Sequence, residues 1–166
     1  WSLSFLGGGH LQEQADVDDD RWADLPGYSR AVVRPRLFWN DGTGGSLFVT
    51  AGATIEDRKG GTLEDEVLGA TGAAYREALH TRRWDAGALW QTLWSGRYVA
   101  SVRAAFSRTS HDHTFGEIAE DDSHGTAFGE FAVRGSAGAH TWVAGAAIEH
   151  DRYESKTLSR FDHSFT

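Results

Sequence analysis

The stretch Ser46-Leu47-Phe48-Val49-Thr50-Ala51-Gly52-Ala53-Thr54-Ile55-Glu56-Asp57-Arg58 decides the fold class, because its side chains alternate in character. Every second residue from Leu47 to Ile55 is apolar, and the intervening positions lead to the charged residues Glu56 and Arg58. Successive side chains of a β-strand point to opposite faces of a sheet. A period of two therefore predicts a strand with one apolar and one polar face.

The same alternation recurs in six further segments, and we interpret each as a strand. They are Trp1–Leu11, Ala31–Trp39, Arg82–Trp94, Tyr98–Ser107, Gly125–Arg134 and His140–Ile148. The first of them is the weakest candidate, since Gly7-Gly8-Gly9 interrupts its pattern. The sequence therefore predicts an all-β fold of about seven long strands.

The connections between these strands alternate in length, which predicts an antiparallel up-and-down meander. Short turns rich in glycine, the usual residue of tight hairpins, are expected at Asn40–Gly45, Ser95-Gly96 and Gly135–Gly138. Long polar connections are expected at Gln12–Ser29, Lys59–His80, Ser110–Ser123 and after Tyr153. We expect the short turns at one end of the sheet and the long loops at the other.

A soluble β-sandwich or barrel would show the same alternation, so other features must separate it from a membrane barrel. Alternating long and short connections, and strands of ten or more residues, are typical of transmembrane barrels. Four aromatic residues lie beside the short turns, as an interfacial girdle requires: Trp39, Trp94, Tyr98 and Trp142. The alanine-rich apolar face would also fill a soluble core poorly. We therefore predict an arc of a large transmembrane β-barrel whose apolar face contacts lipid.

The opposite face is predicted to line the lumen of that barrel. It carries charges of both signs, at Arg34, Arg36, Glu56, Arg58, Asp85, Arg103, Glu130, Arg134 and Glu149. Mixed signs indicate internal pairing or a polar contact surface rather than a ring that selects one charge.

The composition excludes several functional classes. With 16 basic and 24 acidic residues the net charge is −8, which argues against a nucleic-acid partner. Cys and Met are both absent, which excludes disulfides, thiolate zinc sites and cysteine nucleophiles. No nucleophile elbow is present among the many Ser, His and Asp residues, so we do not expect an enzyme.

We expect residues 1–166 to be an internal part of a longer protein. The chain opens at Trp1 without an initiator Met or the pattern of a signal peptide, and it ends in mid-pattern. Single-chain bacterial barrels have an even number of strands, whereas about seven are predicted here. An isolated arc would also leave two unpaired edges in lipid, which is not tolerated.

Several segments resemble those of a known family in the kinds of residues they contain and in their order along the chain. Near the start of the chain these are Asp24–Arg30, Val33–Trp39, Ser46–Thr54 and Glu56–Thr62, followed by Arg83–Gly87 and Gly96-Arg97-Tyr98. They resemble the barrel of TonB-dependent outer-membrane receptors of Gram-negative bacteria. The resemblance covers nearly the whole chain, and no single diagnostic motif carries it. Residues 1–166 are accordingly interpreted as part of such a barrel domain, without the plug and the remaining strands.

The resemblance implies a 22-stranded, plugged barrel that imports a scarce nutrient such as a ferric siderophore or cobalamin. Its implied partners are membrane lipid, the plug domain of the same chain, TonB through an N-terminal region, and a small nutrient ligand. No cofactor is required. A passive porin-like barrel and a soluble β-rich interaction domain are the alternatives, and sequence upstream that encodes a plug would distinguish the receptor from the porin.

One acidic motif has the spacing of a calcium loop. Asp16, Asp18, Asp20 and Asp24 occupy relative positions 1, 3, 5 and 9, as in the first part of an EF-hand loop. Position 6 is Arg21 instead of Gly, however, and position 12 lacks the bidentate Glu. The motif predicts weak Ca²⁺ binding at an extracellular loop, and a solvated acidic loop is the alternative.

A second motif is rich in histidine. His111-Asp112-His113 places two imidazoles on one side of an extended chain, and His124 is expected across the following loop. Three imidazoles could hold a transition metal ion. The alternative is an ordinary polar loop in a chain with 8 histidines.

Overall fold

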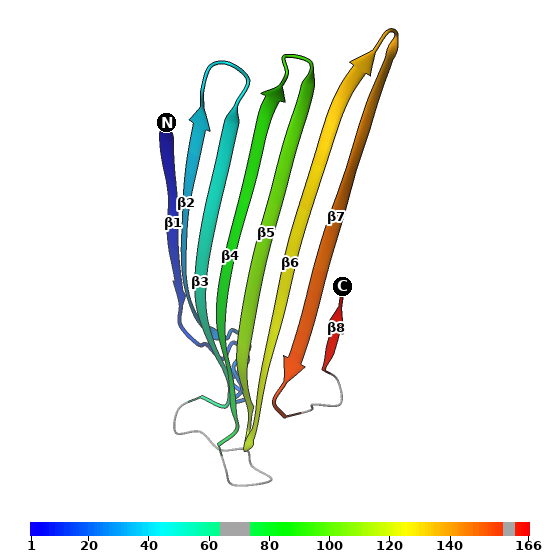
Figure 1. Cartoon of the computed structure of the whole chain (residues 1–166). Coiled ribbons are helices and arrows are strands. Elements are labelled where there is room, and N and C mark those ends of the chain that lie inside the picture. Colours follow the sequence, from blue (N-terminus) through cyan, green and yellow to red (C-terminus); the bar gives the residue numbers. More distant parts are fainter. Residues whose placement is uncertain (64–73, 158–161) are drawn as a thin grey trace.

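The computed structural model describes residues 1–63, 74–157 and 162–166, which form one antiparallel sheet (Figure 1). Each strand pairs with the next one in the chain, so the order in space is the order in sequence. The strands are β1 (Ser2–Gln12), β2 (Gly27–Asn40), β3 (Ser46–Gly61), β4 (Arg76–Trp94), β5 (Tyr98–Phe115), β6 (Ile118–Ala137), β7 (His140–Ser155) and β8 (His163–Phe165). The predicted all-β, up-and-down meander is confirmed. Among the described residues, no helix is long and apolar enough to cross a membrane.

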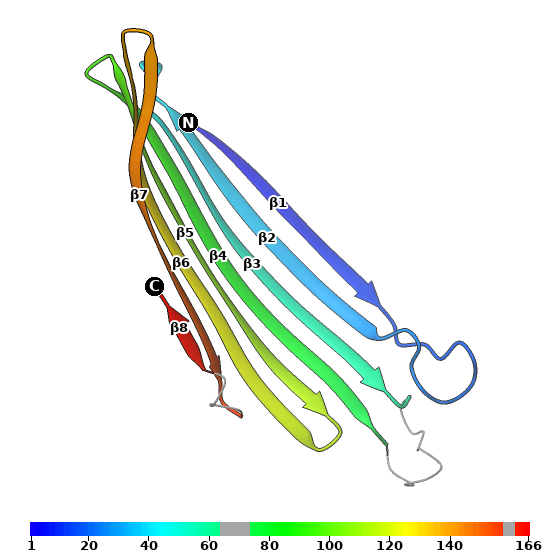
Figure 2. The same cartoon turned by 90° about the vertical axis from the view of Figure 1, so that its right-hand side faces the viewer.

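The sheet is open, because β1 and β8 lie at its two opposite edges and do not pair with each other. Figure 2 shows the strands side by side with a common tilt, from β1 at one edge to β7 and the short β8 at the other. An open, tilted meander of long strands is consistent with an arc of a barrel.

All seven predicted strands are present, and most are longer than predicted. Gly7-Gly8-Gly9 does not interrupt β1, since these residues pair in register with Val33, Val32 and Ala31. The three-residue strand β8, which pairs with the end of β7, was not predicted.

The prediction of a charged loop at Ser110–Ser123 is wrong. Strands β5 and β6 run through this segment and meet at a tight turn, in which Gly116 has a φ of 61°. Both faces of this hairpin are polar, so its sequence lacks the alternation of apolar and polar residues from which strands were predicted. The backbone pairing of β5 with β6 nevertheless continues to the turn.

The turns that precede β3, β5 and β7 all lie at one end of the sheet, the upper end in Figure 1. The prediction that the three short turns share an end is therefore confirmed. The opposite end holds the connection at 13–26, the tight β5–β6 turn, and the adjoining ends of β3 and β4 and of β7 and β8. The predicted long connections at Lys59–His80 and after Tyr153 include residues 64–73 and 158–161, which lie outside the described residues. The predicted strict separation of long from short connections is thus wrong at the β5–β6 hairpin. We refer below to the two ends as the short-turn end and the loop end.

The strand register shows that the apolar positions share one face. One row of directly paired residues crosses six strands and is almost wholly apolar: Trp39, Leu47, Trp90, Val102, Phe131 and Ala146. The same register places all nine charged residues that were expected on the opposite face on that face, from Arg34 on β2 to Glu149 on β7. The predicted sidedness is confirmed.

The apolar face has no interior to pack against. Ala100 is the one hydrophobic residue that is buried in the described part of the chain, and Trp84, Phe106 and Phe131 are about half exposed. The accessible surface is 11438 Å². A compact monomer of this mass would expose about 8,100 Å². An exposed apolar face of this extent is typical of a surface that contacts a membrane or another protein.

The apolar face forms a band with distinct margins. At the short-turn end an aromatic row borders it, in which the ring centroids of Tyr98 lie 6.1 Å from Trp94 and 5.9 Å from Trp142. At the loop end Arg108 and Arg152 mark the other margin. Tyr98 and Arg108 are ten positions apart on β5, about 34 Å along the strand and about 26 Å along the barrel axis when the strand is tilted by 40°. This is the height of the lipid-facing band of outer-membrane barrels.

Candidate functional site

The polar face carries a series of ion pairs that join neighbouring and next-neighbouring strands. Arg34 on β2 and Asp85 on β4 lie 2.7 Å apart, and Arg103 on β5 lies 3.4 Å from Glu130 on β6. Glu56 on β3 is buried, and it accepts hydrogen bonds from Tyr28 Oη at 3.0 Å and Arg58 Nε at 2.7 Å. Six of the nine charged residues predicted for this face, namely Arg34, Asp85, Glu56, Arg58, Arg103 and Glu130, are thus paired within it.

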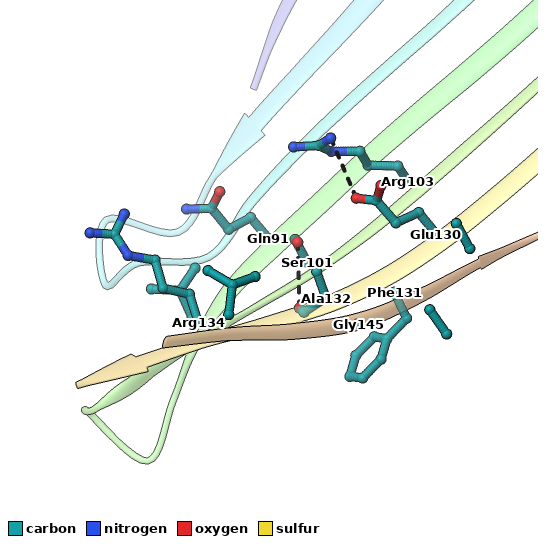
Figure 3. A pocket seen from close by; sticks show the side chains of 12 residues that line it. Gln91, Ser101, Arg103, Glu130, Phe131, Ala132, Arg134 and Gly145 are labelled. Atoms are coloured by element: carbon teal, nitrogen blue, oxygen red, sulfur yellow. Dashed lines mark hydrogen bonds and ion pairs between the residues drawn. The ribbon is translucent and has the colours of Figure 1, made fainter. Parts of the chain in front are cut away.

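An open hollow of about 630 Å³ lies on this face toward the short-turn end. Arg103, Glu130 and Arg134 contribute charge to its lining, and Gln91 and Ser101 contribute neutral polar groups. Figure 3 shows Arg103 and Glu130 directed toward each other, while the ring of Phe131 lies on the other side of the sheet. The hollow offers both donors and acceptors to a polar partner.

A cluster of His and Asp residues lies on the same face at the loop end. His111 Nδ1 is 3.0 Å from Asp122 Oδ1, and His113 Nε2 is 3.6 Å from Asp122 Oδ2. The two imidazole rings have centroids 5.6 Å apart, and His113 also stacks on Phe115. One carboxylate therefore holds two imidazoles, one on each oxygen. We call His111, His113 and Asp122 the His–Asp cluster.

A second carboxylate nearby is bonded by other histidines. Asp151 Oδ2 lies 2.7 Å from His124 Nε2 and accepts a hydrogen bond from Thr126 Oγ1 at 3.0 Å. His163 Nε2 is 3.7 Å from Asp151 Oδ1. The prediction that His124 joins His111 and His113 is therefore not supported by the geometry, because His124 is bonded to Asp151 instead.

Sequence reasoning missed Asp122, Asp151 and His163. Asp122 was assigned to a loop, whereas the register places it directly across from His111. The sequence does contain a signal for this pairing. A tight turn at Gly116-Glu117 would pair the polar residues that follow His111 with those that precede His124, and it would place Asp122 opposite His111.

The acidic loop between β1 and β2 is fixed at the loop end of the sheet. Its Ala15 and Leu25 exchange backbone hydrogen bonds of 3.0 Å, so the loop closes on itself. Trp22 stacks on Tyr75 with ring centroids 5.6 Å apart, and the Ala23 amide donates to the Gly61 carbonyl. The loop thus packs beside the ends of β3 and β4 (Figure 2).

Three of the four predicted calcium ligands converge in this loop. Carboxylate oxygens of Asp16, Asp18 and Asp24 lie within 4.8 Å of one another. Asp20 is not in this group, and its carboxylate accepts a hydrogen bond from the Trp22 amide at 2.8 Å. Arg21, at the position that is Gly in an EF-hand, has a φ of 73°, in the left-handed region that favours Gly.

The electrostatics of this loop are those of crowded carboxylates. The charge of Asp20 raises the pKa of the Asp18 carboxyl above its ordinary value, and the charges of Asp24 and Asp16 add to this effect. Partial desolvation acts in the same direction. Calcium at these residues stays a prediction from their spacing.

Comparisons of the chain with protein-family models, with curated protein sequences and with solved structures found no match.

Proposed function

We propose that this chain forms part of the barrel wall of a TonB-dependent outer-membrane receptor of a Gram-negative bacterium. The observation that carries the proposal is the contrast between the two faces of the sheet. The described part of the apolar band holds no Asp, Glu, Lys or Arg between its aromatic and arginine margins, and its large side chains lack an interior partner. In a bilayer, hydrocarbon would cover these side chains without a second layer of protein.

The margins of the band support an orientation. Trp39, Trp94 and Trp142 at the short-turn end match the aromatic girdle of the periplasmic interface, where barrel turns are short. The connections at the loop end then face the outside of the cell. The acidic loop and the His–Asp cluster would both lie on the extracellular side, which is where a nutrient ligand enters.

The charge pairing on the polar face supports the proposal that the barrel lumen is filled by a plug rather than open. Pairs such as Arg34 with Asp85 and Arg103 with Glu130 neutralise the wall locally. The hollow beside Arg103 leaves donors and acceptors exposed for a further polar surface. In the proposed receptor this surface is the plug domain of the same protein, TonB acts through an N-terminal region, and the cargo is a scarce nutrient such as a ferric siderophore or cobalamin. The role is transport, without catalysis.

The unpaired edge strands support the proposal that this sheet is part of a larger barrel. The outer backbone groups of β1 and β8 have no partner strand in the described sheet. Unpaired strand edges in hydrocarbon cost several kcal/mol per group, so further strands must complete the wall in a membrane.

The test uses the whole protein in its own cells, with and without TonB. We expect the protein in the outer-membrane fraction, and we expect TonB-dependent uptake of radiolabelled ferric siderophore or cobalamin at limiting supply. Uptake that persists without TonB would favour a passive porin. Recovery of the protein from the soluble fraction would overturn the membrane assignment and favour a soluble interaction domain.

A further inference from the structure

The His–Asp cluster is built by the register of one hairpin. His111 and His113 are two residues apart on β5, so their side chains share the polar face. Asp122 on β6 pairs directly with His111 and lies diagonal to His113, within reach of both side chains. Three groups that commonly bind transition metals are therefore brought together by rigid, paired strands rather than by a loop.

The spacing of the three groups suits a single metal ion. Their ligand atoms all lie within 4.8 Å of one another. The His111–Asp122 and His113–Asp122 separations are 3.0 and 3.6 Å. Four ligands at 2.0–2.1 Å from a tetrahedral zinc ion are about 3.3–3.4 Å apart. These two separations, one to each oxygen of Asp122, bracket this value. Side-chain rotations would bring one of the two oxygens and both imidazole nitrogens around a single ion.

Asp122, like Asp151, differs in its ion-pair partners from three other carboxylates of the polar face. Asp85, Glu56 and Glu130 each pair with an arginine. In the described part of the chain, the ion-pair partners of Asp122 are His111 and His113 alone. A divalent cation bound by this cluster would compensate the negative charge of the carboxylate.

The side chains of the cluster are also accessible. Those of His111, His113 and Asp122 are 31%, 26% and 19% exposed, so an ion can reach them without opening the sheet. The neighbouring carboxylate of Asp151 is less available, because His124 and Thr126 already bond to the same oxygen.

We propose that His111, His113 and Asp122 bind one divalent transition-metal ion, for which Zn²⁺ is the probe. Two imidazoles and one carboxylate form a donor set that favours such ions over Ca²⁺ or Mg²⁺, which prefer oxygen ligands. Three protein ligands leave a coordination position open, so the ion can exchange or carry a further ligand. The inference stands apart from the proposed transport function, since metal binding can be measured without uptake.

The test is zinc titration of the whole purified protein in detergent, followed by isothermal calorimetry and by X-ray absorption at the zinc edge. We expect one site with imidazole scattering, and we expect it to persist in millimolar Ca²⁺ and Mg²⁺. His111→Gln, His113→Gln and Asp122→Asn should each weaken zinc binding at this site by at least ~10-fold, the least that loss of a metal-supporting group typically costs.

His124→Gln is the matched control, because His124 lies on the same face but bonds to Asp151. It should leave zinc affinity unchanged within about 2-fold, and a loss equal to that of His111→Gln would overturn the proposed ligand set. Wild-type zinc affinity in the triple variant His111→Gln, His113→Gln, Asp122→Asn would overturn the site itself. Circular dichroism of each variant verifies the β-structure, and wild-type protein that shows no imidazole scattering at the zinc edge would also refute the proposal.

Discussion

Arg34 and Asp85 form a bidentate salt bridge that crosses an intervening strand. Arg34 Nη2 donates to Asp85 Oδ1 at 2.7 Å, and Nη1 lies 2.7 Å from Oδ2. The two residues belong to β2 and β4, and Gly52 of β3 pairs directly with Asp85 beneath the bridge. A Cβ atom at Gly52 would lie 2.5 Å from Nη2 and 2.7 Å from Oδ2. The absence of a side chain at Gly52 therefore permits the bridge.

Gly52→Val should separate this ion pair and destabilise the protein. We expect a loss of about 1.5–3 kcal/mol in the free energy of unfolding, the range for hydrogen bonds to charged groups. Urea unfolding in detergent micelles measures it. Gly87→Ala is the matched control, because a Cβ there makes an ordinary 3.6 Å contact with Thr50. If Gly52→Val costs as much in an Asp85→Ala background as in the wild type, the bridge is not the cause.

The two faces of β5 should respond differently to a new charge. Val102 lies near the middle of the apolar band, and Ser101 lies on the polar face. In a lipid bilayer Val102→Arg should cost about 2–4 kcal/mol of stability, the range for arginine at the bilayer midplane. Ser101→Arg should cost much less, since the lumen is polar. Refolding into lipid vesicles with urea titration measures both, and equal losses would contradict the assigned faces.

The strands were predicted best where the side chains on their two faces differ in polarity. From Tyr98 to Ser107 apolar and polar positions alternate, because one face of the strand carries apolar side chains and the other carries polar ones. Beyond Ser110 both faces of the β5–β6 hairpin are polar, so the pattern carried no strand signal there. The boundaries of β5 and β6 were therefore predicted too short.

The candidate site was predicted only in part, because a ligand set depends on strand register. The spacing of His111 and His113 along one strand is visible in the sequence. Their partner Asp122 is fixed by where the hairpin turns, and a shift of one residue there would have moved it to the other face. The same dependence explains why His124 was grouped with His111 and His113, whereas the register brings it to Asp151.

The turn between β2 and β3 should show a pH-dependent stability. The Asp41 carboxylate accepts hydrogen bonds from the Thr43 and Gly45 amides at 2.7 and 2.8 Å, which lowers its pKa below the ordinary 3.8. A lowered pKa in the folded state means that the stabilisation is present above pH 3.8 and is lost as the pH falls through the folded value. The turn should therefore loosen only in strong acid.

Amide exchange at Thr43 and Gly45, compared between the wild type and Asp41→Ala at matched pH, tests this turn. We expect faster exchange in Asp41→Ala at neutral pH, and we expect the difference from wild type to disappear as the pH falls through the folded pKa of the Asp41 carboxyl. Asp41→Asn keeps an uncharged acceptor and should show no change in relative protection across this range. A constant difference between wild type and Asp41→Ala from pH 7 to pH 2 would contradict a role for the charge.

Calcium should order the acidic loop through Asp16, Asp18 and Asp24, because a cation relieves the repulsion that raises the pKa of Asp18. We expect Ca²⁺ to protect residues 12–29 of the intact protein from protease, with a weak affinity of about 10⁻⁴–10⁻³ M, as in extracellular calcium modules. Asp18→Asn should abolish this protection, whereas Asp20→Asn should retain it, since the Asp20 carboxylate is not among the three that converge. Cleavage that is unchanged at several millimolar Ca²⁺, or lost equally in both variants, would leave a solvated acidic loop without a calcium site.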